Sequence, residues 1–197
     1  MKEIRSFYFS ADGVFLTRVY FAAIQALEDK GVSVRDNHRL EISGLEKDLL
    51  TGAIAEEEYF NALSSISKAA TPITQKTFLD YIRLNLGLLN LVKELGSKRE
   101  VVLFSDYPKT WLEKLDRDGK LTSLFKRVIY LRDMGCGNLY GLVLDRLESD
   151  HQLKAGGCLW VDGDPLRTSM VIRRGIDAII YVDERRLRRE LRLRSIL

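Results

Sequence analysis

The chain has 197 residues, of which 46% are hydrophobic and 30% charged, and its formal net charge is +3. These values are typical of a globular protein with a sizeable core and argue against a disordered chain. No apolar run approaches the roughly 20 residues of a membrane helix, so we expect no membrane association. The N-terminus shows no signal-peptide pattern, and Cys136 and Cys158 lack metal-ligand spacing. We therefore expect a cytoplasmic protein with reduced cysteines.

Five short apolar runs, each bounded by turn residues, predict β-strands. They cover residues 4–9, 101–104, 128–131, 158–161 and 178–182. Their nearly continuous hydrophobicity is typical of strands that are buried on both faces of a parallel sheet. Helix-patterned segments at residues 109–115, 139–147 and 165–174 separate the later strands. This alternation predicts an α/β fold with a doubly wound, Rossmann-like parallel sheet.

The long interval between the first two strands has a helical pattern throughout. Its predicted helices cover residues 19–29, 45–50, 56–67 and 75–95. About 80 helical residues at this point predict a cap subdomain that is inserted after the first strand and lies over the carboxyl edge of the sheet. We therefore assign residues 16–96 to a helical cap, and residues 1–15 and 97–197 to an α/β core domain.

The positive charge of the chain is concentrated at its C-terminal end. Residues 183–197 contain six arginines and three acids, a net charge of +3, and the remainder is formally neutral. One interpretation is a solvated helix that docks on the body through Leu187 and Leu191. Another is a surface for an acidic partner or for a second copy of the chain. No aromatic residues are interleaved with the arginines, so nucleic acid is the least favoured partner.

The segment most informative about function is residues 7–15, where an apolar run stops at Ser10 and a turn follows at Asp12-Gly13. In α/β domains, loops at the carboxyl ends of strands bind ligands. The segment resembles the first motif of the haloacid dehalogenase-like hydrolases, Asp-x-Asp-Gly-(Thr/Val), with Ser10 at the position of the first Asp. A helical cap after this motif is also the layout of the capped phosphatases of that superfamily. The resemblance implies that Ser10 stands at the nucleophile position and that Asp12 is the general acid and base.

Residues 101–108 resemble the second motif of the same superfamily, an apolar strand that ends in Ser or Thr before a Tyr-Pro turn. The resemblance implies that Ser105, with Asp106 beside it, binds phosphate, although a serine here is also a favourable helix N-cap. The third motif supplies a lysine, but the sequence has no lysine between Lys126 and Lys154. Arg132 is the nearest basic candidate for phosphate binding, with an exposed surface arginine as the alternative.

The fourth motif of the superfamily is an acidic pair that binds magnesium after the fourth strand. Two alignments of residues 159–169 compete. One takes Gly163-Asp164 as the Gly-Asp of the family and leaves Ser169 where a second Asp often stands. The other, which we prefer, puts Asp162 at the first position and Gly163 in place of the principal metal ligand. Either way the motif is eroded, and we expect Asp12, Asp162 and Asp164 to form a weak magnesium site or none.

The changed groups indicate altered chemistry. An aspartate is ionised at neutral pH, whereas a serine hydroxyl is neutral and attacks only with the help of a base or a metal. We therefore expect a pseudoenzyme of this superfamily, catalytically impaired and binding a small polar or phosphorylated ligand. The alternative is an active magnesium-dependent phosphatase with an unorthodox site, in which Asp12, or a water held by Asp162 and Asp164, does the chemistry.

Overall fold

The computed structural model describes residues 3–68, 71–135, 140–150, 153 and 155–197. Cys136, which we expect to be reduced, lies outside these residues. The strands form one sheet of five parallel strands in the order β3-β2-β1-β4-β5. They are β1 (Ser6–Ser10), β2 (Glu100–Ser105), β3 (Arg127–Tyr130), β4 (Cys158–Asp162) and β5 (Asp177–Ile180). The predicted α/β fold with a Rossmann-like parallel sheet is confirmed.

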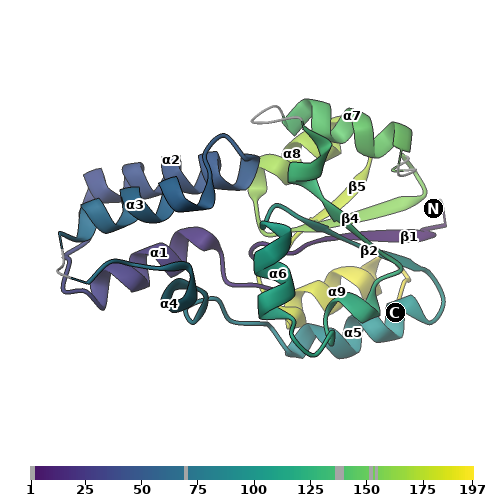
Figure 1. Ribbon diagram of the computed structural model, residues 1–197. Coiled ribbons are helices and arrows are strands. Elements are labelled where there is room, and N and C mark those ends of the chain that lie inside the picture. The colour runs from purple at the N-terminus through teal and green to yellow at the C-terminus, as the bar shows by residue number, and fades with distance from the viewer. Residues whose placement is uncertain (1–2, 69–70, 136–139, 151–152, 154) are drawn as a thin grey trace.

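Helices cover both faces of this sheet (Figure 1). Side chains alternate along each strand, so Phe7 and Phe9 point to one face and Tyr8 to the other. The first face packs against α5 (Gly87–Gly96) and α9 (Glu184–Leu193). The second packs against α7 (Tyr140–Asp150) and α8 (Pro165–Arg173). Burial on both faces explains why the strands read as continuous apolar runs.

The register of the sheet brings three strand ends together. Ser10 pairs with Phe104, so Ser105 lies one residue beyond it on the neighbouring strand. On the other side of β1, Phe9 pairs with Val161, which places Asp162 level with Ser10. The last residues of β1, β2 and β4 are therefore neighbours at one edge, where ligands bind in open parallel sheets.

A group of helices lies beyond this carboxyl edge (Figure 1). It consists of α1 (Val19–Glu28), α2 (Asp36–Thr51), α3 (Glu56–Ser67) and α4 (Gln75–Leu79). Helix α1 packs against the other three. Helix α3 has the predicted bounds, whereas α2 is longer than the predicted segment 45–50. The division of the chain into a core and a cap at residues 16–96 stays a prediction.

The single helix predicted for residues 75–95 is wrong, because the structure has two helices there, α4 and α5. Between them the backbone crosses beside the loop after β1. Leu84 forms a bridge with Leu16, and the amide of Asn85 donates to the carbonyl of Phe15 at 2.7 Å. Backbone groups paired in this way cannot form helical hydrogen bonds. Beyond the break, α5 packs against β2.

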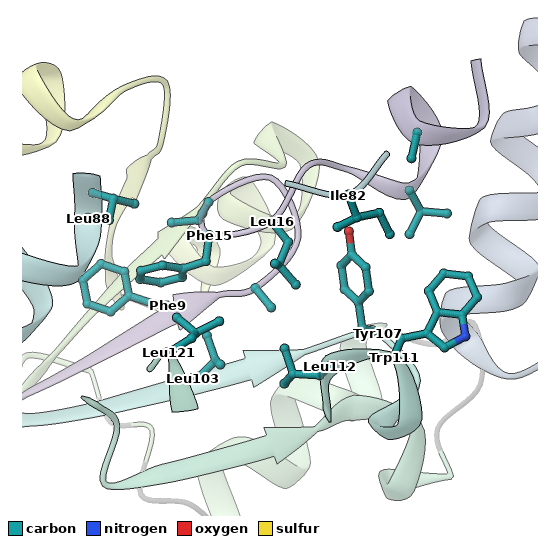
Figure 2. Close-up of a cluster of buried hydrophobic side chains, with 14 of the residues drawn as sticks. Phe9, Phe15, Leu16, Ile82, Leu88, Leu103, Tyr107, Trp111, Leu112 and Leu121 are labelled. Atoms are coloured by element: carbon teal, nitrogen blue, oxygen red, sulfur yellow. The ribbon is translucent and has the colours of Figure 1, made fainter. Parts of the chain in front are cut away.

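The helices α1–α4 are fastened to the sheet by the segment after β2, which includes α6 (Lys109–Leu115). The Tyr107 hydroxyl donates to the carbonyl of Thr17 at 2.5 Å. The Trp111 indole donates to Glu56 at the start of α3 at 2.6 Å. Figure 2 shows both aromatic rings in the buried cluster that runs from Phe9 of β1 toward the helices. The cluster therefore continues from the sheet into the helical group.

Two 3₁₀ turns complete the described elements, at Thr122–Leu124 and Leu131–Met134. In the arginine-rich helix α9, Leu187 and Leu191 are buried, so the helix docks through these two side chains as one interpretation of the sequence predicts. A partner for its arginines stays a prediction. None of the helices within the described residues is both long enough and apolar enough to cross a membrane.

Candidate functional site

Ser10 is the last residue of β1 and is fully buried. Its hydroxyl donates to the backbone carbonyl oxygen of Asp12 at 3.1 Å. The chain then turns at Gly13, whose φ of +73° is a conformation that side-chain-bearing residues resist. The hydroxyl at the predicted nucleophile position is thus directed at a peptide carbonyl rather than at a carboxylate.

Asp12 is almost fully buried at the start of the segment that leads to α1. One carboxylate oxygen accepts from the amide of Val19 at 3.4 Å, and the other lies 3.6 Å from Nε of Arg18. The Arg18 guanidinium also reaches Glu46 of α2, at 3.5 Å. Glu46 is itself buried and accepts from the amide of Tyr20 at 2.8 Å. Arg18 therefore joins a carboxylate at the strand edge to one on a covering helix.

Burial raises the pKa of Asp12 from 3.8 to about 8. The negative charges of Asp106 and Glu46 act in the same direction, while the guanidinium groups of Arg167 and Arg18 oppose them. Burial also raises the pKa of Glu46. The carboxyl group of Asp12 is therefore mostly protonated at neutral pH.

The end of β2 places Ser105 and Asp106 beside Ser10. The Ser105 hydroxyl is fully buried, and none of the described residues is within hydrogen-bond reach of it. One carboxylate oxygen of Asp106 accepts from the Arg167 guanidinium. The other is buried and also lacks a partner in the described part of the chain. Buried polar groups are nearly always hydrogen-bonded, so two such groups without a partner among the described residues, at Ser105 and Asp106, are unusual.

The end of β4 supplies Asp162, which is fully buried. One of its carboxylate oxygens accepts from the Trp160 indole at 3.3 Å. The other accepts from the amide of Asp164 and from Nη2 of Arg167, both at 2.9 Å. Burial raises the pKa of Asp162, and the Arg167 guanidinium opposes this rise. All these contacts hold the Asp162 carboxylate in place.

Asp164 has a structural role at the start of α8. Its side chain accepts from the amides of Leu166 at 2.8 Å and Arg167 at 3.2 Å, as an N-cap residue does. Gly163, just before Asp164, packs against the turn that follows β1 at Gly13. A Cβ atom at Gly163 would lie 3.0 Å from the carbonyl oxygen of Gly13. The two loops therefore approach too closely for a carboxylate at position 163.

Arg167, in the first turn of α8, connects these groups, although we predict no role for it from the sequence. Its Nη1 donates to Asp106 and its Nη2 to Asp162, and Nη2 also lies 3.4 Å from the Ser10 hydroxyl. The guanidinium carbon is 5.8 Å from the centre of the Tyr140 ring. Burial lowers the pKa of Arg167, but the acids around it outweigh this and hold it well above its usual value. A permanently charged guanidinium thus occupies the centre of the predicted site.

The position of Arg167 at the site could have been predicted from the sequence. An arginine three residues after an N-cap aspartate lies in the first turn of the helix, at the same sheet edge. The roles of Arg18 and Glu46 depend on how helices α1 and α2 pack over that edge. Local sequence does not determine this packing.

Arg132, the predicted phosphate ligand from the third motif, lies against Gly52, the C-cap of α2. A Cβ atom at Gly52 would be 3.5 Å from Nε of Arg132. Its Nη1 is buried and finds no hydrogen-bond partner within the described ranges. The structure thus places Arg132 beside the end of a covering helix, and its role in binding phosphate stays a prediction.

The groups at the strand ends differ from the magnesium site that the resemblance implies. Magnesium is held in proteins by carboxylates, waters and substrate oxygens. Here β1 offers a hydroxyl, both oxygens of Asp162 already accept hydrogen bonds, and Asp164 caps α8. Across the residues that the structure describes, no three His, Cys, Asp or Glu side chains are placed to hold a metal ion. The residues therefore do not fit magnesium in this conformation.

A cavity of about 760 Å³ lies beside the site. Its walls come from the turn of residues 13–18, the crossing segment of residues 83–85, Gly163, and the segment of residues 181–184; Phe21 also lines it. Ser10, Ser105 and Arg167 are not in its wall. A second cavity, of about 750 Å³, lies between α4 and α6, away from the strand ends. The first cavity is the one next to the predicted catalytic loop.

No protein-family model and no curated protein matches this sequence, but solved structures share its fold. One, from Porphyromonas gingivalis, is described as a predicted HAD-like family hydrolase; identity is 20%, the TM-score is 0.72, and the match covers 96% of this chain and 98% of that one. Another is the HAD family enzyme bt-2542 from Bacteroides thetaiotaomicron, with 13% identity, a TM-score of 0.74 and coverage of 94% and 98%. A wild-type complex of bt-2542 with magnesium and inorganic phosphate matches at 14% identity and a TM-score of 0.66, covering 93% and 98%. The chain thus has the fold of the haloacid dehalogenase-like hydrolases.

Proposed function

We propose that this chain is a haloacid dehalogenase-like hydrolase relative that has lost phosphatase activity and binds a small polar or phosphorylated ligand at the strand ends. The loss of activity is supported mainly by one observation. The Ser10 hydroxyl, at the nucleophile position, donates its hydrogen bond to the Asp12 carbonyl oxygen. A serine needs a base to become a nucleophile at neutral pH, and a peptide carbonyl cannot take its proton.

The charged groups around Ser10 also argue against attack. The carboxyl group of Asp12, two residues after Ser10, is directed at Val19 and Arg18. With a pKa of about 8 it is mostly protonated at neutral pH, so only a minor fraction of the molecules carries the carboxylate that could accept a proton. Arg167 lies at 3.4 Å from the Ser10 oxygen and can donate to it, which draws electron density away from a would-be nucleophile.

Ligand binding is supported by buried polar atoms that lack hydrogen-bond partners among the described residues. They are the Ser105 hydroxyl, one oxygen of Asp106, Nε of Arg167 and the Tyr140 hydroxyl. Leaving such groups unpaired costs about 1–3 kcal/mol each. A small molecule with several acceptor oxygens could pair with the three donors, and bt-2542, of the same fold, was solved with inorganic phosphate.

Magnesium has a minor place in this proposal. Structures of the same fold hold it, but the donor groups here are occupied by hydrogen bonds and a guanidinium. We therefore propose that this chain binds magnesium weakly or not at all.

The second candidate is an active phosphatase with an unorthodox site, and one observation favours it. A general acid must be protonated at the working pH, which a pKa of about 8 would achieve for Asp12. The nucleophile would then be a water near Asp162 and Asp164. This candidate is weaker because both carboxylates already accept hydrogen bonds from the chain.

The two candidates differ in turnover. We expect no phosphate release above background from para-nitrophenyl phosphate or from a panel of phosphorylated metabolites, with MgCl₂ or with EDTA. Turnover that disappears in Asp12→Asn but persists in the control Asp80→Asn, on the surface, would overturn the proposal. Binding would be measured as a rise in the melting temperature with inorganic phosphate and the same panel, and Ser105→Ala, which removes one of the three donors, should make this rise smaller.

A further inference from the structure

One cation gathers acidic groups from several elements of this site. Arg167 donates to Asp106 after β2 and to Asp162 at the end of β4. Its Nε lies 3.9 Å from a carboxylate oxygen of Asp164. Nη2 also reaches the Ser10 oxygen at the end of β1, at 3.4 Å. A guanidinium on the first turn of α8 thus contacts the three strand ends that define the site.

The position of this guanidinium is fixed. The Arg167 side chain is 13% exposed, and its partner Asp162 is fully buried. The Tyr140 ring lies alongside, 5.8 Å from the guanidinium carbon. Two hydrogen bonds to different carboxylates and an aromatic neighbour restrict a side chain that is otherwise flexible. The positive charge of Arg167 is therefore held at the strand ends and does not move freely at the surface.

The buried carboxylates of Asp106 and Asp162 are stabilised by a positive charge between them. Burying carboxylates close to one another is costly unless a positive charge or hydrogen bonds compensate them. No group of three acidic, histidine or cysteine side chains within the described ranges converges on a point where a metal could sit. Arg167 contacts Asp106 and Asp162 directly, so the compensation comes from the chain itself.

We propose that the Arg167 guanidinium takes the place of the divalent cation in this fold. It acts as a tethered counter-charge that neutralises the acidic strand ends and keeps a metal out. The inference deepens the proposed function and rests on it, because it concerns the same site. It predicts that restoring a carboxylate at Ser10 is insufficient to create a metal site, because the guanidinium must also be removed.

The test is calorimetric titration of MgCl₂ alone into four folded proteins. They are the wild type, Ser10→Asp, Arg167→Gln and the double variant with both changes. Glutamine keeps a hydrogen-bond donor and most of the side-chain length while removing the charge. We expect the double variant to bind Mg²⁺ about tenfold or more tightly than the wild type or Ser10→Asp. The matched control is Arg174→Gln, which removes an arginine at the C-cap of the same helix, paired there with Asp145, and should not gain binding.

Two results would overturn the inference. One is Mg²⁺ binding by the wild type as tight as that of the double variant. The other is a double variant that unfolds cooperatively yet binds Mg²⁺ no better than the wild type. If the double variant does not fold in EDTA, refolding it with MgCl₂ replaces the titration: recovery of the folded protein supports the inference, and failure to recover contradicts it.

The two proposals fail separately. Phosphatase activity in the wild type without metal would overturn the proposed function and leave the tethered counter-charge standing. A folded double variant that binds Mg²⁺ no better than the wild type, together with no turnover by the wild type, would overturn only the tethered counter-charge.

Discussion

Replacing Asp12 with asparagine should make the protein increasingly more stable than the wild type as the pH rises. In the folded protein the pKa of Asp12 is about 8, against 3.8 for an ordinary aspartate, chiefly because the group is buried. Between these values the folded state keeps a proton that the unfolded state releases. The free energy of unfolding of the wild type therefore falls with rising pH through this window, and the contribution of the retained proton is lost above about pH 8. Asparagine has no such proton to lose.

The size of the effect follows from the same pKa. One retained proton lowers the free energy of unfolding by at most about 1.4 kcal/mol per pH unit, or by about 4 kcal/mol between pH 5 and pH 8. Burial also raises the pKa of Glu46, and Arg18 joins it to Asp12, so the two groups share part of the response. We expect the asparagine variant to gain roughly 2 kcal/mol on the wild type over this range. The pKa of Asp162 is also raised. Its contribution to the pH dependence of unfolding is the same in both proteins and cancels when they are compared.

The assay is urea unfolding of the wild type and Asp12→Asn at several values between about pH 5 and pH 8, with the slopes of the transitions compared to verify that both unfold in one step. Asp80→Asn, on the exposed C-cap of α4, controls for the loss of one surface charge. If the wild-type and Asp12→Asn profiles run parallel, Asp12 is ionised in the folded protein. Protonation of Asp12 would then not explain why it fails to act as a base for Ser10.

Three other substitutions test single features of the site by urea unfolding at constant pH. Asp164→Ala removes the N-cap of α8 and should lower the free energy of unfolding by about 1 kcal/mol; an unchanged value would show that the cap contributes nothing. Ser105→Ala removes a buried hydroxyl that has no partner among the described residues, so without ligand we expect no loss and a gain of up to about 1 kcal/mol. A clearly lower free energy of unfolding for Ser105→Ala would show that the Ser105 hydroxyl makes a hydrogen bond in the folded protein. Gly163→Ala puts a Cβ atom 3.0 Å from the Gly13 carbonyl and should cost about 1–3 kcal/mol, whereas tolerance would mean that the two loops move apart easily.

The strands and the groups at their ends could be predicted because local sequence determines them. An apolar run in a parallel sheet ends where polar residues begin, and such ends share one edge. The resemblance to the superfamily motifs singled out Ser10, Ser105 and Asp162 at such strand ends, and the register of the sheet places the three residues together. It gave no information on which hydrogen bonds these groups make.

The features that sequence missed depend on packing between distant segments. The helical pattern of residues 75–95 hides a break, because the crossing near Leu84 is stabilised by pairing with Leu16. Arg167 reads as one more helix-surface arginine until its place beside Asp106 is known. Arg132 follows a strand as expected, yet its side chain lies against Gly52 of the covering helices. Tertiary contacts decided each of these outcomes.

The two segments that join helices α1–α4 to the sheet lie side by side. The amide of Thr17 donates to the Arg83 carbonyl at 3.1 Å, and the amide of Arg83 donates to the Thr17 hydroxyl at 3.1 Å. Because the segment between residues 17 and 83 begins and ends at the same place, a short turn could replace it with little loop-closure entropy. A different helical block could be grafted onto the same two anchor points without altering strand register. Recombination at this one junction would therefore be enough to give an unchanged sheet a new cover over its strand ends.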